Sequence, residues 1–323
     1  MTAAHQESPM NESHSSSSPS ITLVLPAHNE QDTLPMTVNA IRSALEGWQL
    51  EIVIIDDGST DETWRVIEEL RIKYHVRGIR FTRNFGHQSA ILAGLLAARG
   101  EAVVTMDADG QHPAELLPVF IEQWRKGYQV VQGVRIRNAT GSWFKRWTST
   151  LFYRILQALA GVDIQSGSAD FRLLARPVLK QVLASTGPLL FVRGLVPWLG
   201  YRTSYVPFEA RPRIAGKTSY TVRQMVRLSL DGLLSFSIIP LRLSVALGFV
   251  ISGASFLYLA YILIIRLGSG DVVPGWASMT GLLSLLGGIQ LLTLGVLGEY
   301  VGRIFIATLQ RPTFVVSQES ELH

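Results

Sequence analysis

Two aspartates, Asp107 and Asp109, follow the apolar run 102–106 and are separated only by Ala108. Two carboxylates at the end of a strand can hold a divalent cation, and such a cation can in turn hold a diphosphate. Gly110 then permits a sharp turn of the backbone. The pattern alone is weak evidence, because two acidic residues after a strand are more often a turn and a solvated helix start. It nevertheless points to metal and nucleotide chemistry.

The elements that must position these carboxylates are short apolar runs that alternate with longer helical patterns from Ile21 onward. This alternation is typical of β-α-β units in a largely parallel sheet, so we expect an α/β fold. Strands are predicted at 21–25, 51–55 and 102–106, and each ends in polar residues. Open α/β sheets bind ligands at the carboxyl edge of their strands. The three polar tips should therefore form one site.

The rest of the chain predicts a membrane anchor. The 323 residues are 47% hydrophobic, and the runs 243–265 and 276–298 carry no charged residue. Each run is long enough to cross a hydrocarbon core as a helix, and two buried core helices are the alternative. Residues 1–20 are polar and serine-rich without an apolar core, so we expect a disordered tail and not a signal peptide. No internal repeat is visible.

Charge predicts the orientation of this anchor. Basic residues flank the two apolar runs on their outer sides, whereas the connecting loop offers only Arg266 with Asp271. The positive-inside rule then places both ends of the chain in the cytoplasm. The net charge of +4 fits a protein at a membrane surface, and nucleic acid is a poorer partner because the basic residues cluster beside the apolar runs. The absence of cysteine excludes disulfides and thiolate chemistry.

Two further stretches are amphipathic. Residues 142–159 interleave aromatic and basic side chains, a pattern that suits either a helix on a bilayer surface or a helix packed on the sheet. Residues 221–240 precede the first apolar run, and we expect a helix that lies flat in the membrane interface.

Six motifs occur in one order along the chain: PAHNE (26–30), IDDGSTD (55–61), RNFG (83–86), DADGQHP (107–113), DFRL (170–173) and GEYVGRI (298–304). Together they resemble glycosyltransferase family 2, and within it the polyprenyl-phosphate glycosyltransferases of bacterial membranes. The resemblance covers residues 20 to 316. It implies a GT-A domain with a mostly parallel sheet over 21–220, the interfacial helix 221–240, two transmembrane helices within 241–300 and a cytoplasmic segment 301–323.

The same resemblance implies roles for individual residues. The nucleotide pocket would be lined by Pro26, His28, Glu30, Asp57, Asp107 and Ala108. We favour Asp57 for the hydrogen bond to the base, and Asp56 could instead cap a helix. Asp107 and Asp109 would hold Mg²⁺ or Mn²⁺, since hard oxygen ligands favour these cations. The residues of the reacting centre would be Asp109, Gln111, Arg135 and Asp170.

The residues that would bind the acceptor match the family pattern only in part. Arg172 and Arg213 match family positions near the acceptor phosphate, and an arginine suits bidentate phosphate binding. The family's serine and lysine are replaced by Thr218 and Ser219, so Lys217 either supplies the missing charge or faces away. Asp170 matches a candidate general base, but a lipid phosphate is already anionic and needs little deprotonation. Its role is either that of a base or that of an orienting group.

Three other positions have modest expectations. His112, before Pro113, is expected to shape the turn and not to bind metal, because histidine mostly suits softer cations. His87 is expected to be an exposed side chain. Glu299 and Arg303 stand four residues apart and predict a salt bridge at the end of a helix.

The resemblance implies an inverting transfer of one hexose to undecaprenyl or another polyprenyl phosphate at the cytoplasmic face of a bacterial inner membrane. Glucose from UDP-glucose is favoured, and mannose from GDP-mannose or a modified UDP-pentose is the alternative. Processive polysaccharide synthesis is disfavoured because the Q-x-x-R-W segment of such synthases is missing. A non-catalytic membrane scaffold is a remote alternative. Glycines in the apolar runs allow close helix approach, and the resemblance implies a homo-oligomer, a dimer or tetramer.

Overall fold

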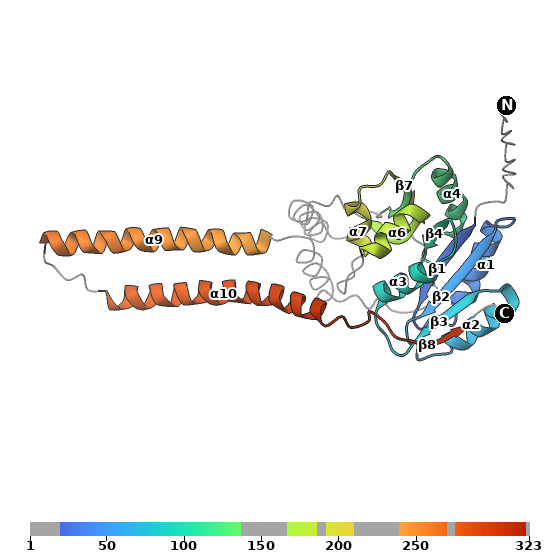
Figure 1. The fold of residues 1–323 in the computed structure, drawn as a ribbon, viewed down its shortest axis with the longest axis horizontal. Coiled ribbons are helices and arrows are strands. Elements are labelled where there is room, and N and C mark those ends of the chain that lie inside the picture. Colours follow the sequence, from blue (N-terminus) through green and yellow to red (C-terminus); the bar gives the residue numbers. More distant parts are fainter. Residues whose placement is uncertain (1–19, 137–166, 186–191, 210–238, 270–274, 321–323) are drawn as a thin grey trace, which may run out of the picture.

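The computed structural model describes residues 20–136, 167–185, 192–209, 239–269 and 275–320. Within them, eight strands form a single sheet in the order β7-β5-β6-β4-β1-β2-β3-β8 (Figure 1). The strands are β1 (Ile21–Ala27), β2 (Leu50–Asp56), β3 (Arg77–Phe81), β4 (Ala102–Thr105), β5 (Val130–Arg135), β6 (Ser168–Ala175), β7 (Thr203–Phe208) and β8 (Val316–Ser320). The tail up to residue 19, the stretch 142–159 and the predicted interfacial helix up to residue 238 lie outside the described residues.

Most strand pairs are parallel, as the alternating pattern predicts. β1 pairs in parallel with β2 and with β4, β2 with β3, and β5 with β7. The antiparallel pairs join β6 to β4 and β5, and β8 to β3. The predicted mostly parallel α/β sheet is therefore confirmed.

Helices cover both faces of the sheet, which is why its central strands are continuous apolar runs. The helices that pack on the sheet are α1 (Leu34–Ala44), α2 (Thr63–Tyr74), α3 (His87–Ala97), α4 (Leu117–Arg125), which a short 3₁₀ turn (Ala114–Leu116) precedes, α6 (Arg176–Ala184) and α7 (Val192–Trp198). One core packs α1, α2 and α4 against the sheet, while α3, α6 and α7 pack on its other face (Figure 1). Successive β1 residues divide between them, with Leu23 in the first core and Val24 in the second.

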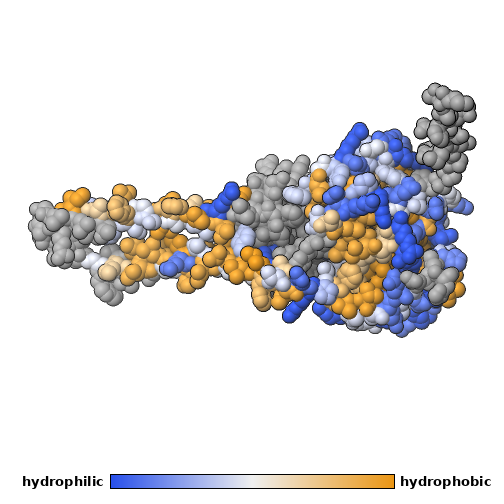
Figure 2. Space-filling view, viewed as in Figure 1, coloured by the Kyte–Doolittle hydropathy of each residue, from blue (hydrophilic) through white to orange (hydrophobic). Residues whose placement is uncertain are grey.

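Two long helices, α9 (Ile239–Ser269) and α10 (Trp276–Thr308), extend side by side away from the sheet (Figure 1). By length and composition both can cross a membrane, over Leu241–Tyr258 and Gly281–Thr308. Many apolar side chains of these helices are exposed, among them Phe249 at 76% and Leu291 at 71%. Hydrophobic residues, drawn in orange, are therefore seen along both helices in Figure 2. Water solvates an apolar surface of this extent poorly. A surface like this is typical of a contact with lipid or with another protein.

Helix α10 is longer than the predicted apolar run, which ends at residue 298. It continues to Thr308, and the two charged residues in this continuation pair with each other: Arg303 Nη2 lies 3.2 Å from Glu299 Oε1. The predicted salt bridge is thus present. After α10 the chain returns to the sheet, where β8 pairs with β3. Residues 316–320 therefore belong to the eight-stranded sheet, whereas the sequence-based division set 301–323 apart.

Candidate active site

A cavity of about 280 Å³ lies where β1, β2 and β4 end. Its walls come from all three predicted strand tips and from the start of α3: Pro26, Ala27, His28, Glu30, Asp57, Asn84, Gly86, His87, Ala90, Asp107, Ala108 and Asp109. The structure thus brings together every residue predicted to line the nucleotide pocket. The expectation that the three tips form one site is met by this geometry.

The Asp107–Asp109 turn is held from several sides. The backbone N–H of Asp107 donates to His112 Nδ1 at 3.1 Å, and the buried His112 ring stacks on Phe171 with centroids 5.0 Å apart. Thr37 of α1 donates to the carbonyl of Ala108 at 3.1 Å. His112 therefore shapes this turn, as predicted.

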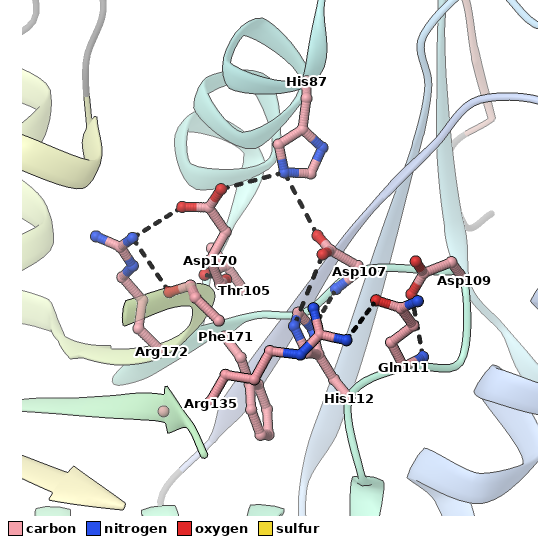
Figure 3. A network of polar contacts seen from close by, with 12 residues as sticks. His87, Thr105, Asp107, Asp109, Gln111, His112, Arg135, Asp170, Phe171 and Arg172 are labelled. Carbon is pink, nitrogen blue, oxygen red and sulfur yellow. Dashed lines mark hydrogen bonds and ion pairs between the residues drawn. The ribbon is translucent and has the colours of Figure 1, made fainter. Parts of the chain in front are cut away.

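Beyond the turn, Gln111 approaches Arg135 at the end of β5. The backbone N–H of Gln111 donates to Asp109 Oδ1 at 3.0 Å, and Arg135 Nη2 donates to Gln111 Oε1 at 3.3 Å (Figure 3). Arg135 is exposed. Its guanidinium thus stands beside the acidic turn with donors to spare for an anionic ligand.

Asp170 of β6 reaches the same site from the neighbouring strand. Its side chain is buried, and Arg172 Nη2 donates to Asp170 Oδ1 at 2.8 Å. Thr105 of β4 donates to the backbone carbonyl of Asp170 at 2.6 Å, and Gln88 of α3 donates to Asp170 Oδ2 at 3.3 Å. Arg172 and Gln88 therefore hold the carboxylate, while Thr105 holds the backbone of the same residue.

Arg172, expected at the acceptor phosphate, is buried beside the site; its contact with the acceptor stays a prediction. Its side chain is 2% exposed and among the largest fully buried ones, because β6 directs it into the protein opposite Thr105. Besides Asp170 it donates to the carbonyl oxygens of Ala169 and Val192. This geometry does not present the guanidinium to a ligand; it orients the Asp170 carboxylate. Arg213 and Lys217, the other predicted acceptor ligands, lie outside the described residues.

His87 is a site residue that sequence reasoning did not single out. At the first turn of α3, its Nε2 lies 3.4 Å from Asp107 Oδ1 and 3.4 Å from Asp170 Oδ2 (Figure 3). It is partly exposed, as expected, yet it connects the two carboxylates that come from different strands. Its place directly after the RNFG motif was the available signal, but a lone histidine carries no information about its partners.

On the nucleotide side, Asp57 holds a loop. Its carboxylate accepts hydrogen bonds from the backbone N–H of Phe85 at 2.7 Å and of Gly86 at 2.9 Å, and the Asp57 carbonyl oxygen is 2.9 Å from His28 Nδ1. Asp57 is 3% exposed, so it lines the cavity wall through a largely covered side chain. Its neighbour Asp56 is fully buried, accepts from the Ser59 N–H and pairs with Arg80, so it does not face the cavity. The predicted contact of Asp57 with a base stays a prediction.

Comparison with known proteins assigns a family to this site. Residues 22–183 match the model described as glycosyl transferase family 2. The chain belongs to this family. A relative from Bacillus subtilis (strain 168), the "Uncharacterized glycosyltransferase YkcC", is 38% identical over 299 residues, which are 92% of this chain and 93% of the relative. The "Prophage bactoprenol glucosyl transferase homolog" of Escherichia coli (strain K12) is 35% identical over 301 residues, 92% of this chain and 98% of that protein.

Among solved structures, one described as a mycobacterial protein is 21% identical with a TM-score of 0.50, covering 68% of this chain and 75% of that one. At this identity the likeness concerns the fold alone. With the family match and the mixed, mostly parallel sheet, it makes the catalytic part of this family 2 glycosyltransferase a GT-A domain.

The acidic turn of this glycosyltransferase fits a divalent cation. Asp107 Oδ1 is buried and accepts no hydrogen bond, with His87 Nε2 at 3.4 Å as its ionic neighbour. A buried carboxylate oxygen without a hydrogen bond calls for an explanation, and a cation ligand is one. In the part of the chain that the structure describes, no three His, Cys, Asp or Glu side chains converge on one point. A cation here would therefore take other oxygens from phosphate and water, as Mg²⁺ does at phosphate sites.

Burial gives Asp57 a testable pH signature. Desolvation raises its pKa above the ordinary value of 3.8, and the hydrogen bonds from Phe85 and Gly86 oppose this shift. In the window above 3.8 the folded chain then binds more protons than the unfolded chain, so stability falls as pH rises through it. When the pH is lowered from 7 to 4.5, we expect the unfolding temperature of the wild type to rise relative to that of Asp57→Asn. Thermal unfolding of both proteins, with the exposed Asp32→Asn as control, checks this; a constant difference would contradict it.

Proposed function

We propose that the protein transfers one hexose, with inversion, from a nucleotide sugar to polyprenyl phosphate, and that UDP-glucose and undecaprenyl phosphate are the favoured substrates. The observation that carries the proposal is a GT-A domain whose cavity is lined by the Asp107–Asp109 turn, in a chain that also has two long apolar helices. Arg135 stands beside this turn through Gln111, and Asp170 lies 3.4 Å from the lining residue His87. The bactoprenol glucosyl transferases among its relatives support a polyprenyl acceptor.

Inversion requires the acceptor oxygen to attack the anomeric carbon from the side opposite the departing diphosphate. A new bond forms between that carbon and a phosphate oxygen of the lipid while the bond to the diphosphate breaks. Mg²⁺ or Mn²⁺ held by Asp107 and Asp109 would neutralise the charge on the leaving diphosphate. Gln111 and Arg135, in contact at 3.3 Å, lie where they can hold donor sugar and phosphate oxygens.

Asp170 is assigned to orientation in this proposal, and not to proton abstraction. A phosphate monoester of a lipid is already anionic near neutral pH, so it can attack without a general base. The Asp170 carboxylate is held by Arg172, Gln88 and His87, which leaves it fixed in direction at the edge of the cavity. A fixed carboxylate can accept a hydrogen bond from a sugar hydroxyl and so orient the donor.

The membrane arrangement is also a proposal. We infer that α9 and α10 cross the inner membrane, with the GT-A domain in the cytoplasm and Arg213 and Lys217 near the acceptor phosphate. The basic residues outside the two spans support this orientation. Because the chain contains no cysteine, Ser269→Cys and Ser317→Cys each create a single label site. A membrane-impermeant maleimide added to spheroplasts should label the first and not the second; the reverse pattern would overturn the orientation.

Homo-oligomer formation belongs to the same proposal. Gly248, Gly253, Gly287 and Gly288 of α9 and α10 have open space where a side chain would stand, so a second copy can approach these faces closely. Mass measurement by light scattering of the detergent-solubilised protein, with the detergent subtracted, distinguishes a monomer from the expected dimer or tetramer.

The proposed reaction is tested by offering labelled UDP-glucose, GDP-mannose and a UDP-pentose to the purified protein with undecaprenyl phosphate in detergent. We expect one labelled lipid, formed from UDP-glucose and only with Mg²⁺ or Mn²⁺. Labelling from another donor would support the proposed transfer reaction but with a different sugar. A long glycan product would favour processive synthesis. No labelling from any of these donors would favour an unusual donor sugar first and a non-catalytic scaffold second.

A further inference from the structure

The C-terminal strap, defined here as residues Leu309–Ser320, leads from the end of α10 back to the catalytic sheet. Its last part is β8, which pairs antiparallel with β3 from Gly78 opposite Ser320 to Phe81 opposite Val316. The pairing is reinforced by side chains: Ser320 Oγ accepts from the Gly78 N–H at 3.0 Å, and Glu319 lies 3.3 Å from the buried guanidinium of Arg77. The strap is thus anchored to the edge of the sheet.

Ahead of β8, the strap meets the residues that follow β3. The backbone N–H of Thr82 donates to the carbonyl of Val315 at 3.0 Å. The Phe314 ring stacks on Phe81 with centroids 4.9 Å apart and an interplanar angle of 13°. Phe81 in turn meets Phe85 edge to face at 5.8 Å. These three rings form a continuous row from the strap to the loop between β3 and α3.

That loop forms one wall of the cavity. Asn84, Gly86 and His87 line the cavity, and the N–H groups of Phe85 and Gly86 donate to the Asp57 carboxylate. On its other side the loop lies close against the turn at Gly58, where an added Cβ would come within 2.3 Å of the backbone of Arg83. The loop is therefore clamped between the Asp57–Gly58 turn and the aromatic row.

We propose that Phe314 is a positioning residue for the nucleotide pocket: by packing on Phe81 and Phe85, the C-terminal strap holds the loop 82–86 in the shape that binds the donor. The proposal rests on the proposed function in taking the cavity as the nucleotide site. It makes the affinity for the donor depend on the strap, the segment that follows the second long helix α10. The competing explanation is that the strap only covers the exposed edge of β3, as edge strands require.

The two explanations predict different effects of Phe314→Ala in the full-length protein. If the strap only covers the edge of β3, Phe314→Ala should change the unfolding midpoint and leave UDP binding unchanged. A positioning residue should also weaken UDP binding and raise the KM for UDP-glucose, by about 2-fold to 30-fold, the range that coupling through packed side chains spans. The kcat should change less than the KM, because Phe314 does not touch the reacting groups. Val315→Ala is the matched control, since the Val315 side chain is 43% exposed and its backbone contact is retained.

The measurement is calorimetric titration of the detergent-solubilised wild type, Phe314→Ala and Val315→Ala with UDP and Mg²⁺, beside hydrogen exchange of the amides of Phe85 and Gly86. We expect weaker binding and faster exchange in Phe314→Ala only, and recovery of both in Phe314→Tyr, which keeps the ring. Should Phe314→Ala fold poorly, Phe314→Leu carries the same comparison. Unchanged affinity and unchanged exchange in a folded variant would overturn the proposal. If the wild type binds no UDP, the nucleotide assignment fails, and the exchange rates alone decide whether the strap holds the loop.

Discussion

Replacing Asp109 with asparagine is expected to reduce sugar transfer by at least about 100-fold, the scale of losing one electrostatic contact to a developing charge. Asparagine keeps an oxygen that can accept from the Gln111 N–H, the bond that Asp109 Oδ1 makes at 3.0 Å. The turn should therefore keep its shape while one negative charge is lost at the proposed cation site. Initial rates of labelled lipid formation, measured over a range of Mn²⁺ concentrations, check this result.

The control separates the charge at the site from charge in general. Asp32→Asn removes a charge from an exposed residue that is not part of the cavity wall, so its rate should match that of the wild type. If Asp109 is a cation ligand, raising Mn²⁺ should recover part of the Asp109→Asn activity, because weaker binding is offset by mass action. Full activity of Asp109→Asn at low Mn²⁺ would contradict the proposed role of Asp109 as a cation ligand.

The features that sequence reasoning placed correctly are those that local physics decides. Apolar runs followed by turns at Gly58 and Gly110 fix the ends of β2 and β4, and parallel pairing with β1 brings all three strand ends to one edge. Both glycines adopt positive φ, 63° and 73°, which few other residues accept. The cavity at that edge follows from these local rules together with the order of the strands.

The features that it missed depend on contacts between distant segments. The β8 sequence VSQES has no apolar alternation, and its strand exists because β3 offers an unpaired edge and a buried Arg77. The contacts of His87 with Asp107, which follows β4, and with Asp170 of β6 form only when α3 packs beside these strands. The hydrogen bonds from Phe85 and Gly86 to the Asp57 carboxylate are a further contact of this kind, which no local pattern indicates; the contact of Asp57 with a base stays a prediction.

Arg172 has a structural contact that its motif position does not indicate. The resemblance places an arginine near the acceptor, and Arg172 is indeed next to the site. Yet it stands in β6 between Phe171 and Leu173, where all three side chains are buried. A buried guanidinium must be paired, and the pair that the strand offers is Asp170, two residues earlier on the same face. Both members of this ion pair are buried, and its carboxylate end lies toward His87 at the cavity.

Removing this guanidinium is expected to destabilise the whole domain. In Arg172→Met the buried Asp170 loses its cationic partner, and breaking a buried pair from one side costs about 3–5 kcal/mol, which lowers the unfolding midpoint by roughly 6–20 °C. Transfer should fall as well, because Asp170 loses the donor that fixes its direction at 2.8 Å. Thermal unfolding in detergent and initial transfer rates below the midpoint measure the two effects separately.

The double variant Asp170→Asn/Arg172→Met distinguishes the structural role from the acceptor role. If the arginine serves the carboxylate, removing both charges should recover much of the lost stability, since the uncompensated charge is gone, while activity stays low. If the arginine instead binds the acceptor phosphate, the single variant should keep its unfolding midpoint and raise the KM for polyprenyl phosphate. The burial of Arg172 and its bonds to Asp170, Ala169 and Val192 favour the first outcome, because a guanidinium with three internal partners has few donors left for a lipid.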